Sequence, residues 1–193
     1  MQLMLIRHGM TAGNLEHCYV GRRTDECLCP AGIQLVQEQA ALLSDMVPDV
    51  VFASPMRRCR ETAEILFPGQ PQILHPDLAE CDFGQFEGKN YQELSGDPAY
   101  QAWIDSGGTL PFPGGESREA FIERCCRALE ELVLSHSFET AAVVVHGGTC
   151  MAVLSELEAS HTPYFDWKIP HCVPFCCQVT RTVPLRLKYE KRK

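Results

Sequence analysis

Short, uniformly apolar runs recur along the chain. Residues 1–6 and 141–145 are almost wholly apolar, and a third run, residues 49–53, stops at Ser54-Pro55. Runs of this length and composition are typical of strands that are covered on both faces of a sheet. The pattern therefore predicts three buried strands.

Segments of helical periodicity separate these strands. Between Ala31 and Met46, for example, apolar residues recur at the three- and four-residue spacing that places them on one face of a helix. The predicted helices span residues 31–46, 56–67, 116–135 and 149–158. Strands that alternate with helices in this order predict a three-layer α/β/α sandwich with a largely parallel central sheet.

The middle of the chain is less regular. Residues 71–115 are rich in glycine and contain a predicted helix near residues 91–104. We interpret this stretch as an inserted lobe over the sheet. The lobe would belong to a single domain that covers residues 1–193, because a chain of 193 residues suits one domain. A long polar loop over residues 13–30 and one or two short strands in the tail, residues 173–189, complete the prediction.

The charge balance limits the classes of partner. The chain has 17 Lys and Arg against 25 Asp and Glu, a net charge of -8, which disfavours a broad surface for nucleic acid or anionic lipid. No apolar run approaches the ~20 residues of a membrane helix, and no secretory signal is recognisable. We therefore expect a cytoplasmic protein with no membrane or nucleic-acid partner, and interpret the basic residues Lys188, Lys191, Arg192 and Lys193 as a solvated end. The pattern does not predict an oligomeric state.

The cysteines indicate a reduced protein rather than a disulfide framework. There are 11 of them, an odd number, and they include the adjacent pairs Cys125-Cys126 and Cys176-Cys177. No Cys-x-x-Cys spacing occurs, so the sequence predicts no structural metal. Most of the cysteines are expected in the core.

Polar residues that can bind anions follow the predicted strands. Arg7 and His8 end the first strand, His146 follows the strand over residues 141–145, and Ser54 precedes a helix that carries Arg58. In open α/β sheets ligands bind at the carboxyl ends of the strands. Arginine matches phosphate oxygens with a planar fork of donors, and helix amino termini add backbone N–H groups. The sequence therefore predicts a phosphate ligand at this edge.

These residues fall into ordered motifs. The motifs are Arg7-His8-Gly9-x-Thr11-x-x-Asn14, Ser54-x-x-x-Arg58-x-x-x-Thr62-Ala63, Leu78-x-Glu80-x-x-Phe83-Gly84-x-Phe86-Glu87-Gly88 and His146-Gly147. Together they resemble the motifs of the histidine phosphatase superfamily, the phosphoglycerate mutase-like enzymes. Pro113-Gly114-Gly115-Glu116-Ser117 is similar to a segment of the small broad-specificity and α-ribazole phosphatases of that family.

The resemblance implies a phosphomonoesterase that uses neither metal nor cofactor. His8 would be the nucleophile and Glu80 the proton donor, whereas Glu87 is the rival for the donor role. Burial beside a phosphate would keep the Glu80 carboxyl protonated near neutral pH. The phosphate-binding residues implied by the motifs are Arg7, Asn14, Arg58, His146 and Gly147.

Several alternatives stay open at this point. The expected substrate is a small phosphorylated metabolite, with α-ribazole 5'-phosphate as one candidate, and the lobe over residues 71–115 would select it. A 2,3-bisphosphoglycerate-dependent phosphoglycerate mutase is disfavoured by the compact chain. A phosphate-binding or interaction module without catalysis is disfavoured because every proposed catalytic residue is present. Gly9 is expected to let a ligand approach the backbone, and Arg57 and Arg60 are expected on the surface.

Overall fold

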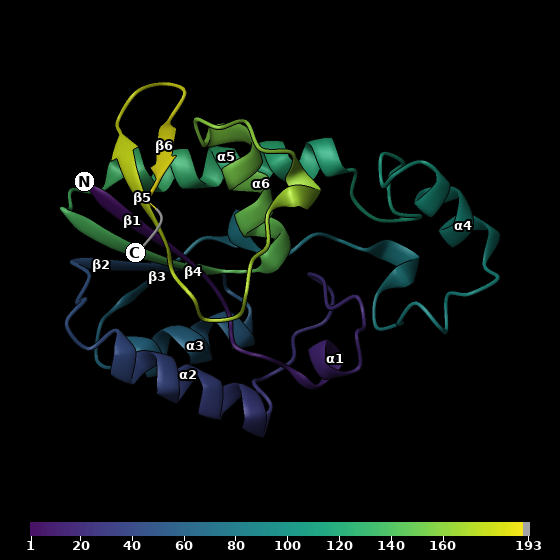
Figure 1. Cartoon of the computed structure of the whole chain (residues 1–193), viewed down its shortest axis with the longest axis horizontal. Helices are drawn as coiled ribbons and strands as arrows, with labels where there is room; N and C mark the ends of the chain where they lie inside the picture. The colour runs from purple at the N-terminus through teal and green to yellow at the C-terminus, as the bar shows by residue number, and fades with distance from the viewer. Residues whose placement is uncertain (191–193) are drawn as a thin grey trace.

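A mixed six-stranded sheet lies between two layers of helices in the computed structural model, which describes residues 1–190 (Figure 1). The strands are β1 (Gln2–Arg7), β2 (Val50–Ala53), β3 (Gln72–Leu74), β4 (Thr140–Val145), β5 (Phe175–Thr180) and β6 (Arg186–Tyr189). The α-helices are α1 (Ala12–Leu15), α2 (Pro30–Leu42), α3 (Arg57–Leu66), α4 (Pro98–Asp105), α5 (Arg118–Ser135) and α6 (Gly147–Leu157). Single 3-10 turns are η1 (Pro76–Leu78), η2 (Gly84–Phe86) and η3 (Tyr164–Asp166). Of the predicted basic end, Lys188 is exposed in β6, and residues 191–193 lie outside the described residues.

The strand order is β3-β2-β4-β1-β5-β6. β3, β2, β4 and β1 are parallel, whereas β5 pairs antiparallel with β1, and β6 antiparallel with β5. The predicted sandwich with a largely parallel sheet is therefore confirmed. The two predicted strands of the tail are β5 and β6, which make the sheet mixed.

Both faces of β1 are buried, as its uniform apolarity predicts. Leu3 and Leu5 belong to a core cluster on the face covered by α5 and α6. Met4 and Ile6 belong to a second cluster on the face covered by α2 and α3 (Figure 1). The alternation of side chains along a strand divides the four residues between the two faces. This burial holds the carboxyl end of β1, and hence Arg7 and His8, in a rigid setting.

Helix boundaries differ from the prediction where turn chemistry overrides periodicity. The helix predicted to end at Met46 ends at Leu42, and the short polar residues Ser44 and Asp45 lie in a turn. The helix predicted near residues 91–104 is α4, which begins later, because Asp97 caps it with its carboxylate and Pro98 occupies its first position.

Two short elements were not predicted. α1 is one turn, closed by reciprocal bonds between Thr11 and Asn14, and β3 has only three residues. β3 pairs in parallel with β2, so the lobe predicted to start at residue 71 begins with an edge strand of the sheet. The part of the lobe that carries α4 projects to one side of the sandwich (Figure 1).

The cysteines and the helices bear on two other expectations. All 11 cysteines are free, and the buried ones are Cys59, Cys81, Cys125, Cys150, Cys172, Cys176 and Cys177. The prediction that most of the cysteines lie in the core is therefore confirmed. Within residues 1–190, no helix is both long and apolar enough to cross a membrane.

Candidate active site

A pocket of about 190 Å³ opens where β1 and β4 end and α6 begins. Five of the residues predicted for the site line it, namely Arg7, His8, Asn14, Glu80 and Gly147. Its remaining walls are Cys18, Tyr19, Val20, Phe83, Gly148 and Met151. The carboxyl edge of the sheet thus brings together residues that are up to 140 positions apart in the sequence, as the strand order requires.

His8 is held as a neutral base. Its Nδ1 lies 2.6 Å from the carbonyl oxygen of Gly9, to which the Nδ1–H donates. Nε2 then carries the lone pair, and no hydrogen-bond partner for it occurs among residues 1–190. Burial, followed by the positive charge of Arg58, holds the pKa of His8 well below its usual range. A neutral ring with one nitrogen fixed and the other free is suited to nucleophilic attack.

Glu80 is a buried carboxyl group with two backbone donors. Its oxygens accept from the N–H of Cys81 at 2.9 Å and from the N–H of Gly148 at 3.0 Å. Burial raises the pKa of Glu80 against the lowering effects of these bonds and of Arg58 and Arg7. The direction agrees with the sequence argument, and a protonated Glu80 is able to donate a proton to a group in the pocket.

Arg7 presents an unpaired donor beside the pocket. Its Nη1 donates to the carbonyl of Ile169 at 2.9 Å, whereas its Nε is buried and has no partner within the described structure. The Nε lies against Gly147, where an added Cβ would be 3.3 Å away. A buried donor without an acceptor is costly unless a ligand supplies one. Asn14 accepts from the Thr11 N–H through Oδ1, which leaves its NH₂ group for a ligand.

Arg58 and His146 lie beneath this pocket and are not among its lining residues. Arg58 is fully buried and uses four of its five N–H donors on the carbonyls of Val20, Gly21 and Thr24 and on Nδ1 of His146. The Nε2–H of His146 in turn donates to Ser54 Oγ at 2.7 Å. The rings of His8 and His146 are in edge contact, with centroids 5.1 Å apart. Arg58 thus holds His146, and the His146 ring packs against His8.

Glu87 holds a loop rather than facing the pocket. Its carboxylate accepts from the N–H groups of Gly21 and Arg23 and from the Thr24 hydroxyl, at 3.2, 3.1 and 2.6 Å. The backbone carbonyls of two of these residues, Gly21 and Thr24, accept hydrogen bonds from Arg58. Glu87 is thus a structural partner of the loop over residues 20–24, and Glu80 is the carboxyl group at the pocket.

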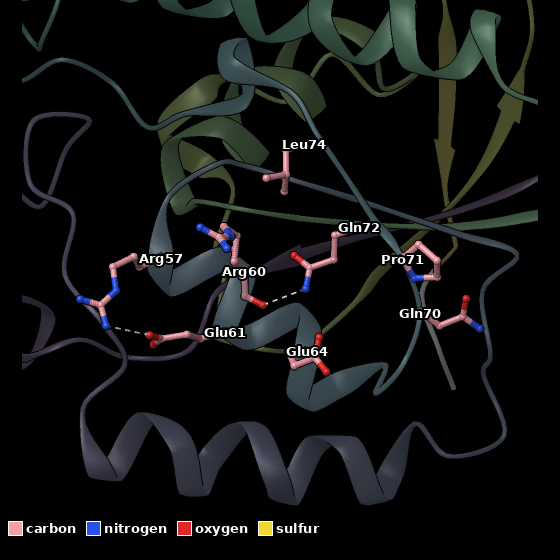
Figure 2. A pocket seen from close by; sticks show the side chains of 8 residues that line it. All are labelled: Arg57, Arg60, Glu61, Glu64, Gln70, Pro71, Gln72 and Leu74. Atoms are coloured by element: carbon pink, nitrogen blue, oxygen red, sulfur yellow. Dashed lines mark hydrogen bonds and ion pairs between the residues drawn. The ribbon is translucent and has the colours of Figure 1, made fainter.

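A separate hollow lies between α3 and β3 (Figure 2). Arg57 and Arg60 line it, and both are exposed, as predicted. Its charges are partly satisfied internally, since Arg57 pairs with Glu61 at 3.3 Å (Figure 2). None of the residues predicted for the phosphate site lies there.

Four residues support the site in ways that the sequence analysis did not assign. Ser54 and Thr62 stand in the motifs: Ser54 binds His146, and Thr62 Oγ1 accepts from the Gly9 N–H at 2.9 Å. The Nδ1–H of His171 donates to the backbone carbonyl of His8 at 2.6 Å. The fourth residue, Arg124, binds the backbone carbonyl of Glu80. Only Ser54 and Thr62 had a signal in the sequence, namely their place in the motifs.

Arg124 fixes the backbone that leads into Glu80. Its guanidinium donates to the carbonyls of Asp77, Ala79 and Glu80 and forms two bonds, of 2.8 and 2.9 Å, with the Glu116 carboxylate. Both charged side chains are nearly buried. This bidentate pair couples α5 to the segment that carries Glu80.

Gly9 was predicted to let a ligand approach the backbone, but in the structure it allows close packing instead. It does not line the pocket, and a Cβ there would overlap Val36 and press on Leu28 and Gly32. The missing side chain therefore allows α2 to pack closely against the start of the loop after β1. Within residues 1–190, no group of three or more His, Cys, Asp or Glu is placed to hold a metal ion.

Comparisons with known proteins agree with the motifs. A family model described as the histidine phosphatase superfamily (branch 1) matches residues 3–182. The adenosylcobalamin/alpha-ribazole phosphatase of Escherichia coli (strain K12) is 29% identical over 161 residues, 81% of this chain and 79% of that protein. A metal-independent phosphoserine phosphatase of Arabidopsis thaliana is 31% identical over 159 residues, 79% of this chain and 66% of that protein.

The fold is shared with solved structures. The crystal structure of the alpha-ribazole phosphatase from Shigella flexneri matches with a TM-score of 0.86 at 24% identity, over 98% of this chain and 95% of that one. At this identity the likeness shows the fold alone. The phosphatase names of the sequence relatives agree with the predicted class of enzyme, a phosphomonoester hydrolase. The chain belongs to the histidine phosphatase superfamily.

Proposed function

We propose that this chain hydrolyses small phosphomonoesters by two successive displacements at phosphorus. In the first, Nε2 of His8 attacks phosphorus, the bond from phosphorus to the ester oxygen breaks, and Glu80 gives its proton to that oxygen. In the second, water attacks the phosphohistidine, the P–N bond breaks, and the Glu80 carboxylate takes a proton from the water. Phosphate is released and the starting state is restored.

The observation that carries this proposal is the pairing of His8 with Glu80 in one pocket. His8 offers a free Nε2 because its Nδ1–H is bound to the Gly9 carbonyl. Glu80 has a raised pKa, so its carboxyl group can hold the proton that the departing alcohol needs. A nucleophile and an acid of these protonation states are what the first displacement requires.

Positive charge and oriented N–H groups stabilise the transferring phosphoryl group in this scheme. The unpaired Nε of Arg7 and the amide of Asn14 bind its oxygens, together with the backbone N–H of Gly147 at the start of α6. Arg58 and His146 act from beneath, through the remaining N–H of Arg58 and through the contact of the His146 ring with His8. Such groups supply the charge stabilisation that metal ions supply in other phosphoryl-transfer enzymes.

We propose a small phosphorylated metabolite as the substrate. Alpha-ribazole phosphate is one candidate, from the name of the Escherichia coli relative, and phosphoserine is another, from the Arabidopsis relative. The lobe after β3 would distinguish them.

The test is to trap the intermediate. During turnover of a radiolabelled phosphomonoester, rapid quenching in alkali is expected to leave phosphate on His8, as identified by mass spectrometry. The His8→Ala variant should leave no label and no activity, and Glu87→Gln serves as the matched carboxylate control. Inversion of configuration at phosphorus, or label on another residue of an active preparation, contradicts the double displacement. Transfer of the label to an added phosphoglycerate in preference to water would indicate a mutase.

A further inference from the structure

A second cavity adjoins the phosphate pocket. It has a volume of about 300 Å³ and shares Tyr19, Phe83, Gly148 and Met151 with the pocket that contains His8 and Glu80. Because four wall residues are common to both, a molecule that places its phosphoryl group in the phosphate pocket extends directly into this second cavity. The cavity is therefore positioned to hold the part of a substrate that departs from phosphorus.

The walls of the cavity are aromatic. Trp103 and Phe112, which belong to the lobe after β3, are stacked with ring centroids 5.0 Å apart and an interplanar angle of 29°. Phe121, Tyr164 and Phe165 line the cavity from α5 and η3. The buried Nε1–H of Trp103 has no acceptor among the described residues. Flat apolar walls with a few unpaired polar groups suit a planar ring that carries a polar substituent.

One cation stands among these rings. Arg118 is the only charged residue in the described lining of the cavity. It is the first residue of α5, where the helix dipole disfavours a positive charge, so helix stability does not account for it. Its ion pair with Glu119 is long, 3.8 Å, and the Glu119 side chain is 67% exposed. The guanidinium lies over the Phe165 ring, 5.7 Å from its centroid, and its charge is left for another partner.

We propose that the aromatic cavity holds a planar leaving group and that Arg118 selects substrates whose leaving group bears an anionic substituent. The inference rests on the proposed function, since it assigns the non-phosphate half of that substrate. The predicted class is an aryl or heteroaryl phosphomonoester with a carboxylate at the end remote from the phosphate. Arg118 binds this carboxylate through two parallel N–H bonds.

Two substrates of equal shape and different charge test the selection. 6-Carboxy-2-naphthyl phosphate and its 6-carboxamide differ only in charge at the far end. We expect kcat/KM to favour the carboxylate by about tenfold to a hundredfold, the usual range for a hydrogen bond to a charged group. Calorimetric titration of both compounds into the His8→Ala variant measures the same preference in binding, without turnover.

Variants of Arg118 identify the group responsible. Arg118→Gln is expected to abolish the preference, and Arg118→Glu to invert it, while circular dichroism confirms that both variants fold. Glutamate is favourable at the first position of a helix, so α5 is retained. Arg127→Gln, at an exposed arginine of the same helix that is absent from the cavity lining, should keep the preference of the wild type.

The outcomes distinguish the assignment of Arg118 from the proposed function. Equal kcat/KM and equal affinity for the two naphthyl phosphates, or a preference that persists in Arg118→Gln, overturns the assignment of Arg118. A preference in binding without turnover of any phosphomonoester supports the cavity and refutes the proposed function. Turnover of both compounds with a preference that depends on Arg118 supports both.

Discussion

Gly148→Ala is expected to disable the proposed acid without touching the nucleophile. The N–H of Gly148 donates to Glu80 at 3.0 Å, and a Cβ at this position would overlap the Glu80 carboxylate, with the carboxyl carbon 3.1 Å away. The carboxyl group must therefore move by several tenths of an ångström or more. A misplacement of about 1 Å costs on the order of 10² in rate, within the ~10² to 10⁴ that a general acid contributes.

The effect on stability should be small by comparison. Alanine is better than glycine in a helix by about 1 kcal/mol, and the crowding of a packed site costs about 1 to 3 kcal/mol. The net change in the free energy of unfolding is therefore expected within about 2 kcal/mol, measured by urea denaturation. Ser155→Ala, on the same helix, is the control, because among residues 1–190 its hydroxyl bonds only to the Ala152 carbonyl, at 3.1 Å.

The assay compares leaving groups. We expect kcat/KM of Gly148→Ala to fall about 10²-fold for an alkyl phosphate such as phosphoserine, and much less for p-nitrophenyl phosphate, whose leaving group needs no proton. Because the effect acts through Glu80, the double variant with Glu80→Gln should be no slower than Glu80→Gln alone. Equal losses on the two substrates, or additive losses in the double variant, would refute this reasoning.

Four further outcomes are expected. Activity should survive EDTA, since arginine and backbone N–H groups supply the charge stabilisation; loss on chelation with recovery on adding a divalent ion contradicts this. Because the pKa of Glu80 is raised and its protonated form is the acid, kcat/KM for an alkyl phosphate should fall as pH rises through that pKa. Glu80→Gln should remove the decline and Glu87→Gln should not. His171→Asn keeps a donor for the His8 carbonyl and should retain most of kcat. His171→Ala should lower kcat about tenfold or more, because an unpaired buried acceptor costs about 1 to 3 kcal/mol. Arg124→Met should lower the free energy of unfolding by about 3 to 5 kcal/mol, because it leaves the nearly buried Glu116 carboxylate unpaired, and calorimetry measures the change.

The sequence predicted the fold and the site best where a single physical rule decides the outcome. Uniform apolarity fixes β1 as a buried strand, and the chemistry of parallel sheets then brings Arg7 and His8 to the edge where β4 ends. The raised pKa of Glu80 followed from burial in the same way. These predictions needed no knowledge of which loop covers the site.

The sequence could not predict hydrogen bonds that arise only from tertiary packing. His171 lies in a segment without periodicity, and it meets His8 because residues 169–172 bind the end of β1 through three hydrogen bonds. Arg58 is turned toward the loop over residues 20–24, whose carbonyls claim most of its donors. Neither partnership leaves a pattern of spacing, since each joins a side chain to backbone carbonyls from a distant part of the chain.

The position of β1 in the sheet has a consequence for the synthesis of the protein. Among the six strands β1 is synthesised first, yet its two neighbours, β4 and β5, span Thr140–Val145 and Phe175–Thr180. The apolar run of β1 therefore remains unpaired while the residues up to β4 are synthesised, and it is a natural binding site for chaperones during that time. His8 comes under its final constraint only when residues 169–172 are synthesised, because these residues bind Arg7 and His8. A nascent chain that ends before them contains His8 without the contacts that hold it in place.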